Sequence, residues 1–165
     1  MKEVWKLMWL LVLLMAARRS PAQVLPEMDD LFIAAVKEGR AHSVHELLTI
    51  YRSYININYE NKNREFPLYI ASKSGYSEVV EVLLQNSYLD INRRHDNGST
   101  ALWIASAGEH YGVVQLLLEH PGTNLTKGMA DNQDKWPSRI KRSLPAQIYS
   151  FDIFPGSDFF ESFLS

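Results

Sequence analysis

The sequence carries one stretch in two copies, and this duplication restricts the possible folds more than any other feature. Residues 66–92 and 100–126 align at a shift of 34 positions. The same residue recurs at eight places in this alignment: Leu68/Leu102, Ile70/Ile104, Ala71/Ala105, Ser72/Ser106, Val79/Val113, Val80/Val114, Leu83/Leu117 and Leu84/Leu118. A fixed period of this length indicates structural units that stack on one another.

Each copy has the pattern of two short helices joined by a turn. The first helix is expected to begin at Pro67 or Ala101, since proline is well tolerated at a helix start. The turns fall at residues 74–75 and 108–109, and residues 96–98 (Asp-Asn-Gly) form a polar loop in which glycine can adopt positive φ. The second helix carries one apolar stripe at helical spacing, made by Val79, Val80, Leu83 and Leu84.

These units resemble the ankyrin repeat. The family's T-P-L-H-x-A motif appears as FPLYIA at residues 66–71 and as TALWIA at residues 100–105, and its G-H-x-E-V-V motif appears as GYSEVV at residues 75–80. The resemblance covers roughly residues 29–126. It implies an all-α repeat solenoid of stacked helix-turn-helix units with short hairpin loops, flanked by flexible N- and C-terminal extensions.

The two copies depart from the family pattern at a few positions. Tyr69 and Trp103 replace the motif histidine, and Phe66 replaces the first threonine. Arg64 stands where the hairpin usually has glycine, and Glu109 stands at the glycine between the helices. A non-glycine residue held at positive φ costs about 1 kcal/mol, so these changes concern loop geometry and not the fold.

The repeats are expected at about residues 29–58, 61–94 and 95–126. Asp29 or Asp30 is the expected N-cap of the first helix, residues 30–35. Residues 51–58 hold about two more residues than the later copy. The second helix of the first repeat draws its stripe from Val44, Leu47 and Leu48.

A fourth repeat begins and does not continue. Trp136-Pro137 takes the place of Phe66-Pro67, but the basic residues 138–142 follow in place of an apolar helix, so residues 127–142 are a degenerate repeat start or a basic loop. Because one repeat cannot bury its own stripe, we expect the face of Leu116, Leu117 and Leu118 to be partly uncovered.

Residues 1–22 have the pattern of a signal peptide. Lys2 and Lys6 precede an apolar run over residues 7–17, which is shorter than the roughly 20 residues needed to span a bilayer. Ser20 and Ala22 give the small-x-small spacing of a cleavage site before Gln23. This pattern favours the secretory pathway. The alternative is a hydrophobic N-terminal helix that covers the first repeat in a cytoplasmic protein, the usual location of ankyrin repeat proteins.

Other short motifs fit the secretory route more weakly. Asn97 and Asn124 lie in N-glycosylation acceptor sequences, although Asn97-Gly98 also suits the turn. Residues 139–142 (Arg-Ile-Lys-Arg) have the form of a convertase site, but a basic loop explains them better.

Residues 143–165 form an acidic and aromatic tail. Pro145, Pro155 and Gly156 argue against a long helix. The tail either folds as a cap on the open end of the stack or stays disordered and recruits a partner. Its composition favours disorder with transient docking.

The sequence offers no catalytic or cofactor-binding motif. A phosphate-binding glycine loop, an H-E-x-x-H pair and a G-x-S-x-G elbow are all missing, and the absence of cysteine excludes thiolate chemistry. His42 and His45 have no third ligand nearby in the sequence, so we predict neither a metal site nor a cofactor. The net charge of −2 gives no indication of nucleic-acid binding.

The resemblance implies a non-enzymatic module that binds another protein on its concave surface. A membrane would be met only through residues 1–22, if these are not cleaved. Two alternatives stay open: a secreted or lumenal effector-type protein processed at Ala22 and near Arg142, or a fragment of a longer ankyrin adaptor. Ankyrin binding positions map onto hairpin tips and first-helix inner faces, here Lys62, Asn63, Glu65, Lys73, Ser74, Asp96, Asn97, Ser99 and Ala107.

Overall fold

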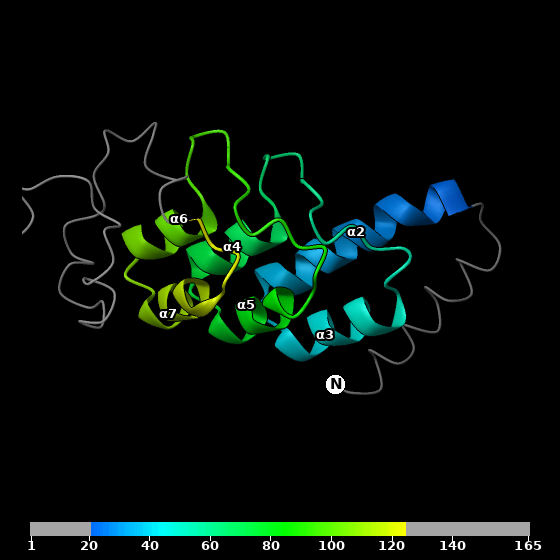
Figure 1. Ribbon diagram of the computed structural model, residues 1–165. Helices are drawn as coiled ribbons and strands as arrows, with labels where there is room; N and C mark the ends of the chain where they lie inside the picture. The colour runs from blue at the N-terminus through cyan, green and yellow to red at the C-terminus, as the bar shows by residue number, and fades with distance from the viewer. Residues whose placement is uncertain (1–20, 125–165) are drawn as a thin grey trace, which may run out of the picture.

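The computed structural model describes residues 21–124, with side chains from Met28 onward. This range contains six helices and no strand (Figure 1). The helices are α2 (Pro21–Lys37), α3 (Ala41–Ile50), α4 (Pro67–Ser74), α5 (Ser77–Leu84), α6 (Ala101–Ala107) and α7 (Tyr111–Glu119).

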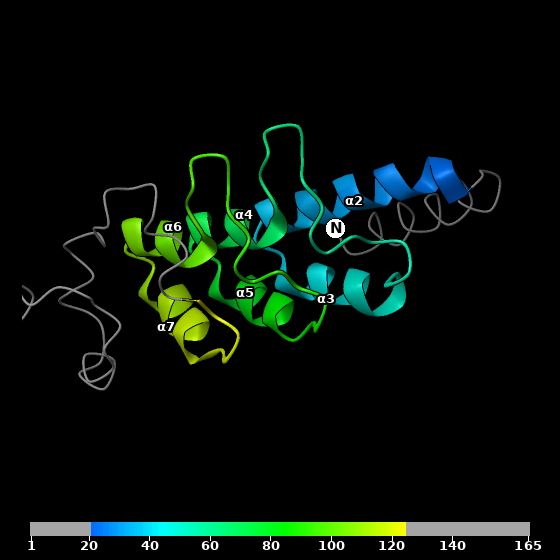
Figure 2. The same ribbon diagram turned by 45° about the horizontal axis from the view of Figure 1, so that its top comes forward.

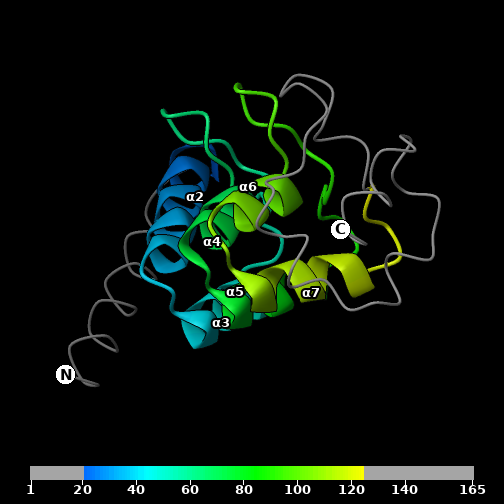
Figure 3. The same cartoon turned by 90° about the vertical axis from the view of Figure 1, so that its left-hand side faces the viewer.

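The helices form two layers, which confirms the all-α repeat solenoid. Helices α2, α4 and α6 lie side by side in one layer, and α3, α5 and α7 lie side by side in the other (Figures 1 and 2). Figure 3 looks along the stack from the α6–α7 end and shows both hairpin loops rising on the side of the first-helix layer. Each helix pair therefore contacts only its neighbours, as expected of a repeat array.

The core is built from the apolar stripes that the repeat pattern predicts. Val79, Val80 and Leu83 of α5 are fully buried, and Val113 and Leu117 of α7 repeat the arrangement. The expectation of a partly uncovered face after the third repeat holds for Leu116 and Leu118, which are half-buried. It is wrong for Leu117, because this side chain takes the same inward position in α7 that Leu83 takes in α5.

Helices α4 and α6 begin where proline and small residues predict. Pro67 opens α4 without a side-chain cap from Phe66, whereas Thr100 caps α6 by accepting a hydrogen bond from the Trp103 amide at 3.3 Å. The C-cap of α4 is Gly75, with a φ of 73° and an amide that bonds back to the Ala71 and Ser72 carbonyls. Phe66 therefore does not cap α4 with a side-chain hydrogen bond, and its ring is buried instead.

Asparagine side chains join the loops of neighbouring repeats. Asn58 donates to the Tyr88 carbonyl at 2.8 Å and accepts from the Asp90 amide at 2.8 Å. One repeat later, Asn92 donates to the Gly122 carbonyl at 2.7 Å and accepts from the Asn124 amide at 2.6 Å. Because a side-chain amide supplies both a donor and an acceptor, asparagine can link two successive loops by their backbones.

The predicted N-cap at Asp29 or Asp30 is wrong. Helix α2 begins at Pro21, so both aspartates lie inside it. Asp29 is buried and accepts a hydrogen bond from the Asn56 amide at 2.8 Å, and Asp30 accepts one from the Tyr59 hydroxyl at 3.3 Å. Burial raises the pKa of the Asp29 carboxyl, although the bond from Asn56 partly opposes this rise. Through these hydrogen bonds, both aspartates connect α2 to the loop between α3 and α4.

The two non-glycine residues at glycine positions keep the backbone conformation of glycine. Arg64 has a φ of 64° and Glu109 a φ of 58°, close to the values at Gly98 and Gly75. The repeat geometry therefore overrides the preference of these two side chains, at a cost of about 1–2 kcal/mol each.

Several predictions concern parts of the chain that the structure does not describe. They include the signal peptide up to Ser20, the basic residues 127–142 and the tail of residues 143–165.

Candidate partner-binding surface

The two hairpins that rise above the first-helix layer share one backbone design. In the first, Asn61 donates its amide to the Glu65 carbonyl at 3.0 Å, and Arg64 donates to the Asn61 carbonyl at 2.9 Å. In the second, His95 donates to the Ser99 carbonyl at 2.9 Å and Gly98 donates to the His95 carbonyl at 2.8 Å. Each tip is therefore held by its own backbone hydrogen bonds.

Ion pairs connect the first hairpin to the second. The Arg64 guanidinium lies 3.1 Å from Asp96 and 3.1 Å from Glu60. Arg93 pairs with Glu60 and places its guanidinium 5.2 Å from the centre of the Phe66 ring. Exposed pairs of this kind contribute about 0–1 kcal/mol to stability. In the structure they link the two hairpins to each other.

Below the hairpins, the inner faces of the first helices carry aromatic and charged side chains. The rings of Tyr69 and His95 stack at a centroid distance of 4.4 Å, which joins α4 to the second hairpin. Lys73 lies 5.9 Å from the Tyr69 ring centre and 3.4 Å from the Glu65 carboxylate. Tyr69 is buried and His95 is half-buried. What this part of the surface exposes is therefore mainly charge, of both signs.

Glu65 is the electrostatic centre of this surface. Its carboxylate accepts a hydrogen bond from Asn61 at 3.2 Å and lies 3.9 Å from the Lys37 ammonium. Burial alone would raise the pKa of Glu65, but the hydrogen bonds from Asn61 and Lys73 and the charges of Lys73 and Lys37 together lower it. The ionised form is therefore the one that the fold stabilises.

Glu65→Gln should lower the free energy of unfolding at pH 7 by about 1 kcal/mol, the size of one typical hydrogen bond. The folded pKa lies below the ordinary value of 4.5. The stabilisation is therefore present above pH 4.5 and is lost as the pH falls through the folded pKa. Urea titrations of both proteins at pH 7, 5 and 4 check this. A difference between the two proteins that stays constant over this range would contradict the argument.

Eight of the nine predicted contact residues fall into three groups. Lys62, Asn63, Asp96 and Asn97 are exposed at the hairpin tips, and Lys73, Ser74 and Ala107 are exposed at the ends of α4 and α6. Glu65 is half-buried and serves the network described above.

Ser99 requires a correction. Its side chain is fully buried and its amide and hydroxyl both donate to the Asn97 side-chain oxygen. Ser99 therefore shapes the hairpin and cannot contact a partner directly. Asn97 and Asn124 are both exposed, and their glycosylation stays a prediction.

Lys37 belongs to this surface and was not among the predicted residues. It lies in the last turn of α2 and reaches Glu65. The sequence could have indicated Lys37, because aligning Gly39 with Gly75 places Lys37 at the position that corresponds to Lys73. The exposed row across the three first helices is therefore Lys37, Lys73 and Ala107.

The histidines in the turn before α7 and on α3 lie next to other residues of the repeats. His110 lies with its Nε2 2.9 Å from the Lys73 carbonyl oxygen, so it links the third repeat to the end of α4. His42 and His45 are exposed on α3, and His42 pairs with Glu46. Within residues 21–124, no group of three or more potential ligand residues is placed to hold a metal ion. The helices of this range also include none that is long and apolar enough to cross a membrane.

Comparison with protein families agrees with the two-layer stack and its hairpins. A family model described as ankyrin repeats matches residues 31–128 in three copies. The chain belongs to the ankyrin repeat family. A search of curated proteins finds no significant match.

Membership of the ankyrin family indicates the general role of this surface. Ankyrin repeats are generally protein–protein interaction modules and are typically not enzymes. In this ankyrin array, the exposed hairpin tips and the row Lys37, Lys73 and Ala107 together make up the candidate surface, called the concave surface below.

Proposed function

We propose that this protein is a non-enzymatic binding module that holds another protein on its concave surface. The observation that carries the proposal is the pair of exposed hairpin tips, which the contacts of Arg64 and Arg93 link to the neighbouring hairpin and loop. A surface that is already ordered loses less conformational entropy on binding.

The charges of this surface indicate the kind of partner. Lys37, Lys62 and Lys73 alternate with Glu65 and Asp96, so no single sign of charge dominates. A nucleic acid requires a basic patch to neutralise its phosphates. A folded protein with both signs of charge matches this surface better.

A pair of substitutions on the concave surface tests the proposal. Lys62→Glu reverses a tip charge, and Ala107→Arg places a bulky side chain on the inner face of α6. Both residues are exposed. In an affinity purification with the full chain from its source cells, we expect the double variant to recover its main protein partners about tenfold less efficiently.

The matched control carries the same kinds of change on the other helix layer. Glu81→Lys and Gln115→Arg alter exposed residues of α5 and α7. This control should retain its partners, and both proteins should melt like the wild type. Equal recovery from the concave variant and the wild type would overturn the proposal.

The secreted version of this function rests on the composition of residues 1–22. Sequencing the N-terminus of the protein isolated from its source distinguishes the alternatives. A mature chain that begins at Gln23 supports secretion, whereas an intact Met1 on cytosolic protein excludes it.

The longer-adaptor version rests on half-buried Leu116 and Leu118, where a further repeat could pack. The apparent mass of the endogenous protein tests this version. A species markedly larger than 19.0 kDa supports it.

A further inference from the structure

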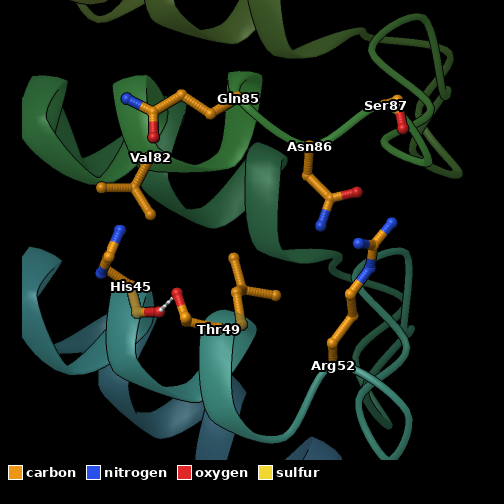
Figure 4. Close-up of a pocket in the computed structure, with 8 residues that line it drawn as sticks. His45, Thr49, Arg52, Val82, Gln85, Asn86 and Ser87 are labelled. Carbon is orange, nitrogen blue, oxygen red and sulfur yellow. Dashed lines mark hydrogen bonds between the residues drawn. The ribbon is translucent and has the colours of Figure 1, made fainter.

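A groove of about 410 Å³ lies between α3 and α5, in the helix layer away from the hairpins (Figure 4). One wall comes from His45, Thr49 and Arg52, and the other from Gln85, Asn86 and Ser87. Its volume is within the range of about 300–1,000 Å³ typical of ligand sites. None of its lining residues is buried, so it is an open trough suited to an extended peptide.

The groove is rich in hydrogen-bond donors and contains no carboxylate. Arg52 and Asn86 point toward the same space from opposite walls (Figure 4). The Asn86 side-chain oxygen accepts from the Tyr88 amide at 3.0 Å, which leaves the amide NH₂ group to donate. Arginine is a donor without acceptor capacity and is always charged. A ligand with carboxylate oxygens complements this lining.

The corresponding positions one repeat later along the stack carry the opposite charge character. Aligning Gly39 with Gly75 places His45 opposite Glu81, and the shift of 34 places Gln85 opposite Glu119. Two carboxylates therefore stand at the corresponding positions of α5 and α7, and both are exposed. These carboxylates would repel an acidic peptide, whereas the lining of the α3–α5 groove contains none.

An exposed aromatic ring lies beside the groove. Tyr88 is 68 % exposed, and the Arg52 guanidinium lies 5.2 Å from its ring centre. Stacked or edge-on aromatic pairs add binding free energy beyond the amount expected from the area that they bury. A peptide that carries both carboxylates and aromatic rings could thus use Arg52 and Tyr88 together.

We propose that this groove is a docking site for residues 143–165 of the same chain. This segment contains three carboxylates, five phenylalanines and neither lysine nor arginine. The intervening residues allow ample reach, because an extended chain covers about 3.3 Å per residue whereas packed helices are only about 8–10 Å apart. The covalent tether also gives an effective concentration of the order of millimolar.

The chain has no cysteine, so a single spin label can report the docking. We would attach a nitroxide to Ser157→Cys in the full-length ¹⁵N-labelled protein. The expected result is selective broadening of the amide signals of Thr49, Arg52, Gln85 and Asn86. Mixing spin-labelled ¹⁴N chain with unlabelled ¹⁵N chain should leave these signals sharp, since the contact is within one chain.

Two variants test the charge complementarity. Arg52→Glu should reduce the broadening about fivefold, the upper range for one exposed charge contact. Asp152→Asn with Asp158→Asn and Glu161→Gln should reduce it at least as much, without touching any residue of the repeats. Lys62→Glu is the matched control, with the same charge change at a hairpin tip, and should leave the broadening unchanged.

Three outcomes would overturn the proposal. The first is unchanged broadening in both the Arg52 variant and the tail variant. The second is broadening centred on Leu116 and Leu118, which would place the segment on the end of the stack. The third is broadening that appears only in the mixed sample, which would show exchange between copies. None of these bears on the concave surface, so the proposed function is tested separately.

Discussion

Gly75→Ala should lower the free energy of unfolding by about 2–3 kcal/mol. Gly75 has a φ of 73°, where an L-residue costs about 1–2 kcal/mol. A Cβ atom at this position would lie 2.5 Å from Nδ1 of His110. The ring must then move and lose its contact with the Lys73 carbonyl, which adds about 1 kcal/mol.

Urea denaturation followed by circular dichroism at 222 nm measures this effect. The reciprocal change is the control: Glu109→Gly places glycine at a φ of 58° and should raise the stability by about 0.5–1 kcal/mol. If alanine at position 75 and glycine at position 109 both left the unfolding midpoint in place, backbone strain would not govern these turns.

Leu83→Ala should cost about 3 kcal/mol, within the range for a buried leucine in a core that relaxes only partly. Leu83 is fully buried in α5, the central helix of its layer, and α5 packs against both α3 and α7. Three repeats are near the minimum for a stable array. We therefore expect the loss to destabilise all three repeats and not the central one alone.

Leu116→Ala is the matched control for Leu83→Ala. Leu116 is half-buried in α7 at the end of the described stack, so its truncation should cost about 1 kcal/mol. Both variants should unfold in a single transition. Equal losses at the two positions, or a separate early transition in the Leu83 variant, would contradict the arrangement of the stack.

The repeated part of the fold could be predicted because its cause is local and periodic. Val79, Val80 and Leu83 recur one repeat later as Val113, Val114 and Leu117, and all six are buried. Gly75 marks a turn because its backbone needs positive φ. The same logic located Arg64 and Glu109 as the two non-glycine residues in that conformation.

The first repeat was harder to predict, because its contacts reach across long stretches of chain. Asp29 looked like an N-cap, but its hydrogen-bond partner is the Asn56 amide, 27 residues away. Lys37 joins the concave surface only through Glu65 of the next repeat. A motif carries information about neighbours in the sequence and little about partners of this kind.

The repeat motif alone also could not predict which side chains are buried or where a groove forms. Ser99 occupies a family binding position, yet it is buried and its hydroxyl donates to the Asn97 side chain. The α3–α5 groove depends on Arg52, which lies in the segment that holds about two extra residues. The alignment shows that this segment contains an insertion, but it does not show where the inserted side chains point.

The proposed function is the binding of another protein by the concave surface of this short ankyrin stack. Hydrogen–deuterium exchange of the full chain, alone and with the partner recovered by affinity purification, tests it most directly. We predict slower exchange at residues 60–66 and 94–100 and along α4 and α6. Protection confined to α3, α5 and α7, or no protection at all, would contradict the claim.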